Sequence, residues 1–470
     1  MLFTQIEFLI FFAVVLVAVW LTRRRVVRNT LLLAASYYFY AYWDYRFCGL
    51  LMLSTVVDYV VAKQMDQSDN DRARWRLLLV SLAVNLGMLG YFKYCDFFID
   101  SARPILQSMG LSGETLGLIL PVGISFFTFQ TLSYTIDVYR RKLKPTDRFL
   151  DFALFVAFFP QLVAGPIVRA RELLPQLAVV PQFSKRRMYG GAQQMLRGAV
   201  KKVLLADRLG EMVDVVFAGP DLYSGITIWI AVLAYAGQIY YDFSGYSDIA
   251  IGAAKMLGYR FPVNFRHPYL ATSMADFWHR WHMTLSRWLR DYLYISLGGN
   301  RRGPWMTYRN LMITMTLGGL WHGAAWTFVL WGIWHGTALA IERAFVQVRS
   351  IRSIFGRSTI GSLGAPLKWL ATMLVVLVGW VLFRSPDLPA ALSMLRRMAT
   401  LDSGIAWFPP LVLGALACLI IEHLMWRTKL HRAMRLPALA WYSPIATTVM
   451  IWALLLYAPR GFRPFVYFQF

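Results

Sequence analysis

The sequence predicts an all-α protein that crosses a membrane several times. Of its 470 residues, 58% are hydrophobic and only 16% are charged, whereas soluble domains average roughly 45–50% apolar and about 25% charged residues. The mean hydropathy is +0.48. Several apolar runs approach the roughly 20 residues that a helix needs to cross a hydrocarbon core of about 30 Å.

Basic residues are in excess but scattered along the chain. There are 48 Lys and Arg against 25 Asp and Glu, a net charge of +23. They lie in short loops between apolar runs, as the positive-inside bias of membrane proteins predicts. We therefore expect contact with anionic membrane lipids and not with nucleic acid. Cys48, Cys95 and Cys418 are too widely spaced to indicate a disulfide framework or a zinc site.

The first apolar run, residues 8–21, is followed by Arg23, Arg24 and Arg25. A secretory signal peptide carries its positive charge before the apolar core, so this run is predicted to be a spanning helix. The arginines place residue 1 on the outer side of the membrane, and the charged loop 63–76 is then cytoplasmic. Further spans are expected at residues 30–43, 47–62 and 77–92.

The next stretch mixes spans with shorter segments. Residues 116–138 are predicted to span, because a basic cluster follows them. The run 149–163 is shorter and has basic residues on both sides, which favours a re-entrant or interfacial segment. The basic residues between 185 and 202, Lys202 among them, predict an amphipathic helix on the cytoplasmic face.

Polar residues enter the apolar runs in the middle of the chain. The three affected stretches are YYDFSGYSDIAIG at 240–252, DFWHRWHMTLSRWLRDYLYI at 276–295 and LGGLWHGAAWTFVLWGIWHG at 317–336. Cleaner spans follow at 367–383, 410–421 and 445–457. The whole pattern predicts roughly ten to twelve membrane helices.

We expect a single membrane domain over residues 1–470. In this interpretation 1–145 and 346–470 form scaffold helices, and 146–345 form a core that carries the active site. We find no internal repeat, so the inverted-repeat signature of many transporters is missing.

Five of the seven histidines lie between residues 267 and 335. A histidine at membrane depth is costly and is by default a functional-site hypothesis. His322 and His335 each lie in a Trp-His-Gly triplet and are 13 residues apart. In one unbroken helix they would point in roughly opposite directions. Gly318 and Gly319 allow either a close backbone approach or a break in that helix.

Three roles are open for these histidines. His279 and His282 form a His-x-x-His pair, but catalytic zinc usually takes three protein ligands and the HExxH spacing is missing. A buried histidine can also simply hydrogen-bond across a helix interface. Alternatively, a neutral imidazole can take a proton from a hydroxyl or thiol, a contribution of about 10²–10⁴ in rate.

The residue pattern therefore leads to a membrane enzyme that uses buried histidine. No Gly-x-Ser-x-Gly elbow offers a nucleophile, so direct transfer between two bound substrates is simpler than an acyl-enzyme. A transporter or polymer channel is the alternative, since polar helices carrying Asp242, Asp248 and Arg280 could line a conduit.

The chain resembles the membrane-bound O-acyltransferase family, in particular its bacterial alginate O-acetyltransferase branch. Cellulose-acetylation proteins and the teichoic-acid D-alanyl branch share the same motifs. The resemblance rests on residues 121–140, 158–169, 241–259, 276–301, 317–336 and 464–470.

The resemblance implies a ring of helices with re-entrant segments around a central tunnel. His322 and His282 match the catalytic positions of the family, whereas His279 and His335 match none. Acetyl-coenzyme A is the expected acyl donor, with no permanently bound cofactor and no metal. The implied location is the bacterial inner membrane.

The expected partners are membrane lipids and periplasmic acetyltransferase proteins, which pass the acetyl group to an exported polysaccharide, alginate or cellulose. A D-alanyl transferase for teichoic acid is a further alternative. The residues expected to line the tunnel or contact substrate are Tyr241, Asp242, Ser244, Asp248, Trp278 and Arg280. Because Asp242 and Asp248 cannot share one helical face well, one is expected to pair with an arginine such as Arg280.

Overall fold

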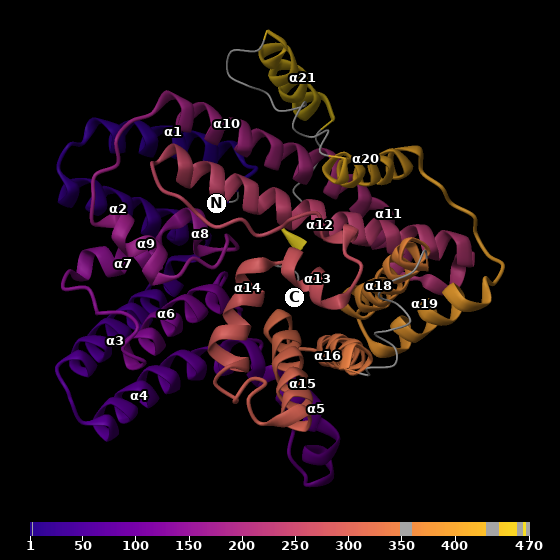
Figure 1. Cartoon of the computed structure of the whole chain (residues 1–470), viewed down its shortest axis with the longest axis horizontal. Helices are drawn as coiled ribbons and strands as arrows, with labels where there is room; N and C mark the ends of the chain where they lie inside the picture. The colour runs from indigo at the N-terminus through magenta and orange to yellow at the C-terminus, as the bar shows by residue number, and fades with distance from the viewer. Residues whose placement is uncertain (2, 348–359, 429–440, 458–463, 467–470) are drawn as a thin grey trace. The chain divides into compact units, whose positions relative to one another are not determined.

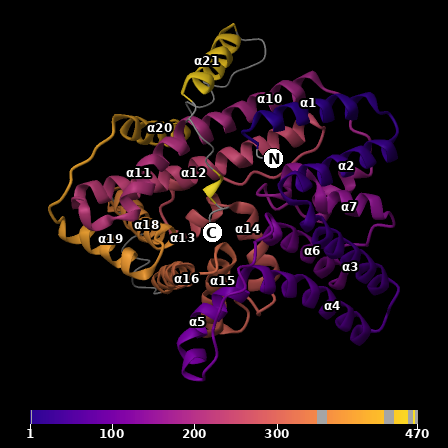
Figure 2. The ribbon, with the colours of Figure 1, turned by 180° about the vertical axis from the view of Figure 1, so that it is seen from behind.

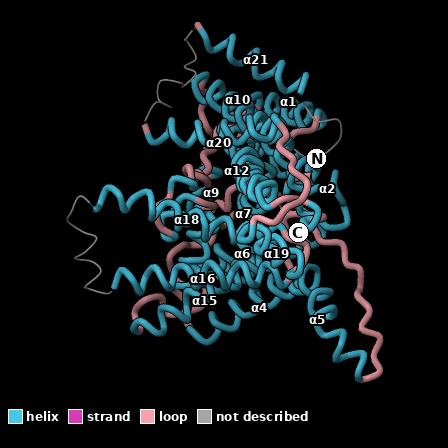
Figure 3. The backbone as a smooth tube through the Cα atoms, turned by 90° about the vertical axis from the view of Figure 1, so that its right-hand side faces the viewer, coloured by secondary structure: helices cyan, strands magenta, loops and turns pink. Residues whose placement is uncertain are grey.

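A computed structural model describes residues 1, 3–347, 360–428, 441–457 and 464–466. Nearly all regular structure in these residues is helical, as Figure 3 shows. The only β-type pairing among them is an isolated bridge between Tyr223 and Ile405. The all-α prediction is confirmed.

The chain folds into two compact units. The first contains residues 1–195 and 246–262, and the second contains residues 196–245 and 263–470. The single domain and its three-part division stay predictions.

The first unit begins with seven helices and two short 3-10 or π segments. These are α1 (Ile6–Leu21), α2 (Arg25–Asp44), η1 (Tyr45–Phe47), α3 (Cys48–Asp66), α4 (Asp71–Leu89), η2 (Gly90–Tyr94), α5 (Cys95–Ser108), α6 (Ile124–Tyr139) and α7 (Phe149–Ala157). Three more helices follow, of which the last ends in the second unit: α8 (Phe159–Leu162), α9 (Ala170–Leu177) and α10 (Lys185–Val200).

A buried polar network joins α3, α4 and α6, which lie side by side in Figures 1 and 2. The Asp58 carboxylate accepts hydrogen bonds from the Ser81 hydroxyl and, at 2.9 Å, from the Asn85 amide. The Ser54 hydroxyl donates to Asn85 Oδ1 at 2.7 Å, and the Thr131 hydroxyl of α6 donates to the same oxygen at 3.2 Å. Such bonds hold helices together where lipid supplies no hydrophobic driving force.

The expected span at 116–138 is wrong in its first part. Helix α6 begins only at Ile124, after Gly123 in the left-handed region at φ +79°. The preceding residues form the loop that follows α5 in Figure 3. The backbone N–H groups of Leu116 and Leu118 donate to the Asp96 carboxylate at 2.8 and 3.1 Å. By accepting these two hydrogen bonds, the Asp96 carboxylate stabilises a non-helical backbone at residues 116–118, where apolarity alone predicts a helix.

The run 149–163 does not cross as one helix. It is divided between α7 and α8, which have 9 and 4 residues. At about 1.5 Å per residue neither can span a core of about 30 Å. The side chains of residues 151–157 are all buried, so this segment lies inside the first unit.

Among the residues that the structure describes, the second unit contains ten helices and four short 3-10 or π segments. They are η3 (Lys201–Ala206), α11 (Asp207–Ala218), η4 (Pro220–Leu222), α12 (Gly225–Met256, whose end lies in the first unit), η5 (Pro268–Leu270), α13 (Met274–Arg280), α14 (Met283–Trp288), η6 (Leu289–Tyr294), α15 (Gly303–His322), α16 (Trp326–Gln347), α18 (Ile360–Arg384), α19 (Leu388–Thr400) and α20 (Pro410–Arg427). The tenth helix, α21 (Tyr442–Tyr457), closes the list.

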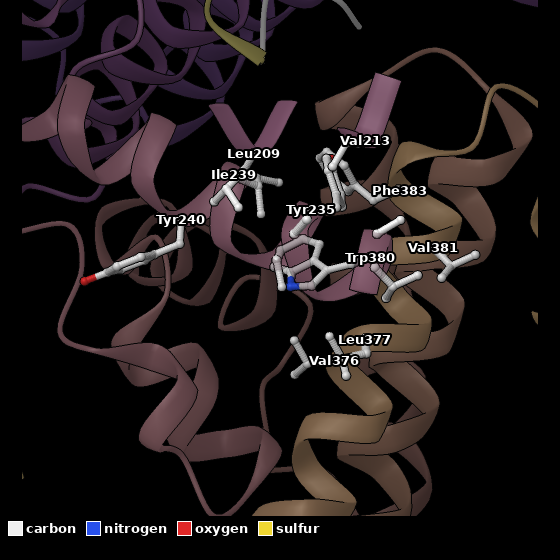
Figure 4. Close-up of a cluster of buried hydrophobic side chains, with 14 of the residues drawn as sticks. Leu209, Val213, Tyr235, Ile239, Tyr240, Val376, Leu377, Trp380, Val381 and Phe383 are labelled. Atoms are coloured by element: carbon white, nitrogen blue, oxygen red, sulfur yellow. The ribbon is translucent and has the colours of Figure 1, made fainter. Parts of the chain in front are cut away.

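The hydrophobic core of the second unit joins α11, α12 and α18. Figure 4 shows Val213 of α11, Tyr235 of α12 and Trp380 of α18 within this cluster. The rings of Tyr235 and Trp380 meet edge to face, with centroids 6.3 Å apart. Fully burying a large apolar side chain contributes about 1.5–3 kcal/mol, so this cluster fixes α18 against α12.

Four helical segments among the described residues are long and apolar enough to cross a membrane. They are Arg25–Asp66, Asp71–Ser108, Gly364–Arg384 and Pro410–Arg427. The chain is thus a multi-pass membrane protein. Helices α12, α15 and α16 have at least 20 residues each, but their polar side chains lower their hydropathy. The total of roughly ten to twelve stays a prediction.

Candidate active site

The stretch 317–336 is a helical hairpin and not one helix. Helix α15 ends at His322, Gly323 is extended at φ −157°, and α16 begins at Trp326. The argument that His322 and His335 point in opposite directions on one helix therefore does not apply. Their different surroundings come from the packing of the two helices.

Two glycines let the helices of this hairpin approach closely. A Cβ atom added at Gly319 would lie 2.2 Å from the Phe328 carbonyl oxygen, and one at Gly332 would lie 2.4 Å from the Met315 carbonyl oxygen. Of the two alternatives for Gly319, close approach is the correct one. This contact positions the last turn of α15 and hence His322.

The His322 imidazole packs among aromatic rings, and the residue is only 5% exposed. Its ring centroid is 5.1 Å from that of Trp331 on α16 and 5.2 Å from that of Phe383 on α18, both edge to face. Three helices thus fix the orientation of one imidazole.

His282 is held at a strained turn between α13 and α14. Its backbone lies in the left-handed region at φ +41°, which is uncommon for a residue other than glycine. The flanking backbone is tied to the preceding segment, because Met283 N–H donates to the Asn264 carbonyl and Arg266 N–H to the Arg280 carbonyl, both at 2.9 Å. Strained conformations held by their surroundings cluster at functional sites.

The side chain of Asn264 determines which nitrogen of His282 carries a proton. Asn264 Oδ1 accepts from the Thr284 backbone N–H at 3.2 Å and from the Thr284 hydroxyl at 2.9 Å. A backbone N–H can only donate, so the atom facing it is the amide oxygen. His282 Nδ1, 3.2 Å from the same oxygen, must then donate as well. This leaves Nε2 as the basic nitrogen of the neutral ring.

His282 and His322 come together in the second unit. Their ring centroids are 6.5 Å apart. His282 is fully buried, and its Nε2 has no hydrogen-bond partner among the described residues. The ring of Phe243 on α12 covers His282 edge to face at 4.6 Å. Two buried imidazoles, one of them with a basic nitrogen, can exchange protons with a hydroxyl or thiol bound beside them.

The other two histidines considered from the sequence lie in different settings. His335 is fully buried beside Trp331 and Trp278, with ring centroids 4.7 and 5.3 Å away. Neither of its ring nitrogens has a hydrogen-bond partner among the described residues. His279 is exposed, and its Nδ1 lies 2.6 Å from the Ala275 carbonyl oxygen.

The predicted pairing of Asp242 or Asp248 with Arg280 is wrong. Arg280 pairs with Asp276 one helical turn away on α13, at 2.8 Å. Asp242 is fully buried and pairs with Lys202 at 2.6 Å. The Lys202 side chain is only 8% exposed, so it does not lie on the polar face of a surface helix. The placement of the helix at 185–202 on the cytoplasmic face stays a prediction.

The remaining predicted tunnel residues have different surroundings. Tyr241 and Ser244 on α12 are buried in the second unit. Trp278 contacts the ring of Trp331, at 5.7 Å, which is itself a neighbour of His322. Asp248 belongs to the first unit, where the Gln194 amide donates to it at 3.1 Å.

The sequence interpretation missed Asn264, Phe243 and Trp331. Nothing in the local pattern around Asn264 distinguishes it from a loop residue, because its role depends on pairing with residues 280–284. Trp331 lies in the quoted motif but has no signal that separates it from packing tryptophans. Among the described residues, no group of three or more His, Cys, Asp or Glu could hold a metal ion.

A multi-pass helical membrane protein that buries two imidazoles side by side has the groups needed for acyl transfer to a hydroxyl. Residues 140–378 match the family model of the membrane-bound O-acyltransferases. The chain belongs to this family.

Relatives cover most of the chain. A probable alginate O-acetylase of Azotobacter vinelandii is 44% identical over 405 residues, 85% of this chain and 78% of the relative. A peptidoglycan O-acetyltransferase of Helicobacter pylori is 38% identical over 397 residues, 79% of this chain and 73% of the relative. A teichoic acid D-alanyltransferase of Bacillus subtilis is 26% identical over 275 residues, 53% of this chain and 68% of the relative.

These relationships confirm the predicted family and the class of enzyme, a membrane O-acyltransferase. The relatives at 38–44% identity are named as O-acetyltransferases or O-acetylases, which supports acetyl as the transferred group. An enzyme is therefore favoured over the transporter or channel alternative.

Proposed function

We propose that this protein passes acetyl groups from a cytoplasmic thioester, acetyl-coenzyme A, across the bacterial inner membrane for the O-acetylation of an exported polysaccharide. Of the two polymers expected, alginate has the stronger support, because it is named in a relative 44% identical to this chain. The D-alanyl alternative has weaker support, from a relative at 26% identity.

The observation that carries the proposal is the pair His282 and His322, buried together with ring centroids 6.5 Å apart. In the proposed reaction His322 accepts the proton of the acceptor hydroxyl as its oxygen attacks the thioester carbonyl. A carbon–oxygen bond forms and the carbon–sulfur bond breaks. The proton then passes to the leaving thiolate, so the imidazole ends the cycle neutral.

His282 has an assisting role in this scheme. Because Asn264 holds its proton on Nδ1, Nε2 can accept a proton or a hydrogen bond from a bound group. The aromatic walls of the site, Phe243, Trp331 and Phe383, exclude water. Exclusion of water protects the thioester from hydrolysis and strengthens electrostatic interactions in the site.

The acceptor is proposed to be a periplasmic acetyltransferase partner, which then modifies the polymer. Because the donor remains in the cytoplasm, the acetyl group must pass to an acceptor that can be reached from the outer side. Anionic lipids around the basic loops are the other proposed partners.

The test compares His322→Ala and His282→Ala with His279→Ala, an exposed histidine on the neighbouring helix. Polysaccharide-bound acetate is measured in cells that hold equal amounts of each protein. We expect His322→Ala to lower acetate by about 10²–10⁴, and His279→Ala to leave it near the wild-type level. Unchanged acetate in the His322 variant would reject the assignment.

A second measurement separates an enzyme from a conduit. Purified wild-type protein with acetyl-coenzyme A should release free thiol, faster when acceptor is added, and His322→Ala should not. A transporter would release no thiol in either case. Replacement of acetyl-coenzyme A by a D-alanyl thioester distinguishes the two transferase alternatives.

A further inference from the structure

The short segment 464–466 lies inside the second unit, although it is far from the catalytic residues in the sequence. Phe465 and Val466 are 2% and 3% exposed. The Val466 backbone N–H donates to Asp242 Oδ2 at 2.7 Å, across 224 residues of chain. The Pro464 carbonyl accepts from the Lys202 ammonium at 3.3 Å. Backbone groups of this segment are thus bonded to both charges of a buried ion pair.

The ion pair belongs to a cluster of three charged side chains. Lys202 Nζ lies 2.6 Å from Asp242 Oδ1 and 2.9 Å from Asp207 Oδ1. The Asp242 side chain is fully buried, and a buried charge is tolerated only when it is paired and its remaining lone pairs are satisfied. The Val466 N–H donates to the second oxygen of Asp242. The segment therefore supplies the hydrogen bond to Oδ2, while Oδ1 lies against the Lys202 ammonium.

The same segment lies next to a wall of the histidine site. The ring of Phe465 meets that of Phe243 at 5.3 Å, and Phe243 meets the His282 ring at 4.6 Å. Phe243 directly follows Asp242 on α12. The carboxylate that binds the segment and the ring that covers His282 are thus consecutive in one helix.

We infer that Asp242 is a positioning residue, which clamps the segment 464–466 so that Phe465 supports Phe243 against His282. Asp242 acts through this segment and not by touching substrate. The catalytic part of the inference rests on the proposed function of His282, whereas the clamp itself can be measured without activity.

The clamp is tested by hydrogen–deuterium exchange of the full-length protein in detergent, resolved at the Val466 amide. In Asp242→Asn a single acceptor oxygen faces two donors, Lys202 and Val466. The charged Lys202 ammonium makes the stronger bond and takes this oxygen, so the Val466 N–H loses its acceptor. We expect the Val466 amide to exchange at least about tenfold faster than in the wild type. Asp207→Asn is the matched control, because it also removes a carboxylate from Lys202 but leaves the Asp242–Val466 bond in place. Its Val466 amide should stay protected.

Acetyl transfer provides the second readout. Val466→Pro removes the N–H donor, whereas Val466→Ala keeps it and loses only side-chain contact. We expect Val466→Pro to lower acetate transfer at least about tenfold relative to Val466→Ala. At equal protein abundance, the KM for acetyl-coenzyme A reports whether donor binding survives, and kcat reports the transfer step.

Two results would overturn the inference: unchanged Val466 exchange in Asp242→Asn, or equal loss of transfer in the two Val466 variants. A different result concerns the proposed function alone. If the Val466 amide is released in Asp242→Asn while His322→Ala and His282→Ala retain full transfer, the clamp is supported and the assigned histidine chemistry is rejected.

Discussion

At the scale of single residues, one amide oxygen determines which nitrogen of His282 is basic. Asn264 Oδ1 receives hydrogen bonds from His282 and from two groups of Thr284. These bonds select the tautomer and fix the ring orientation at a backbone conformation that histidine rarely adopts. The arrangement predicts that Asn264 matters for rate although it need not touch substrate.

Asn264→Leu should lower acetyl transfer by about 10–10² because the His282 ring loses its orientation. Thr284→Val is the matched control, since it removes one donor to the same oxygen and leaves the His282 bond. Transfer rates are measured at equal abundance of folded protein. Similar rates in Asn264→Leu and Thr284→Val would show that the orientation of His282 is unimportant.

The two Trp-His-Gly histidines should respond differently to the same replacement. His322→Leu should abolish most transfer. His335→Leu should keep most of it, because His335 lies among Trp278 and Trp331 and its ring nitrogens have no hydrogen-bond partner among the described residues. Acetyl transfer by, and thermal unfolding of, both purified variants provide the comparison. Equal losses of transfer at equal stability would assign His335 to the chemistry as well.

At the scale of elements, the hairpin of α15 and α16 is the part on which His322 depends. Its helices touch at Gly319 and Gly332, where there is no space for a Cβ atom. Small residues at such contacts let helix backbones approach closely in membranes. The glycines of the motif are therefore explained by packing of one helix on the other.

Gly319→Ala should destabilise the protein by about 1–3 kcal/mol, because the new methyl group would overlap the Phe328 carbonyl. Gly414→Ala on α20 is the control, since a Cβ there meets nothing within 4 Å; alanine also favours a helix interior over glycine by about 1 kcal/mol. Thermal unfolding in detergent measures both. A Gly319 variant as stable as the Gly414 variant would contradict the close contact.

At the scale of the whole molecule, basic loops and apolar runs together predict a membrane topology. Lysines and arginines in the short loops favour the cytoplasmic side through the positive-inside bias. With residue 1 outside, we expect the charged stretch 63–76, which contains the end of α3 and the start of α4, to face the cytoplasm, and the chain beyond α4 to return to the outer side.

Cysteine labelling tests this topology in a variant that lacks Cys48, Cys95 and Cys418. In spheroplasts whose inner membrane is intact, a membrane-impermeant maleimide reaches only the outer side. A cysteine at the exposed position Asp69 should therefore resist labelling, whereas one at the exposed position Ser108 should react. Permeabilised cells, in which both should react, supply the control. Labelling with the opposite preference would invert the orientation.

The sequence by itself determined the helical class, the membrane location, the family and the two histidines proposed for catalysis. This information is local: apolar runs, basic loops and short motifs have the same meaning wherever the segments pack. It failed where a helix start depends on a distant group, as at Leu116 and Leu118, whose N–H groups bond to Asp96.

Tertiary structure decided which buried polar groups meet. It paired His282 with Asn264, 18 residues away, and Asp242 with Val466, 224 residues away. It also brought the supposed surface residue Lys202 into the interior. A buried donor or acceptor must find a partner wherever the fold supplies one, and sequence spacing does not specify that partner. The two histidines could therefore be predicted from the sequence, whereas the groups that orient and enclose His282 could not.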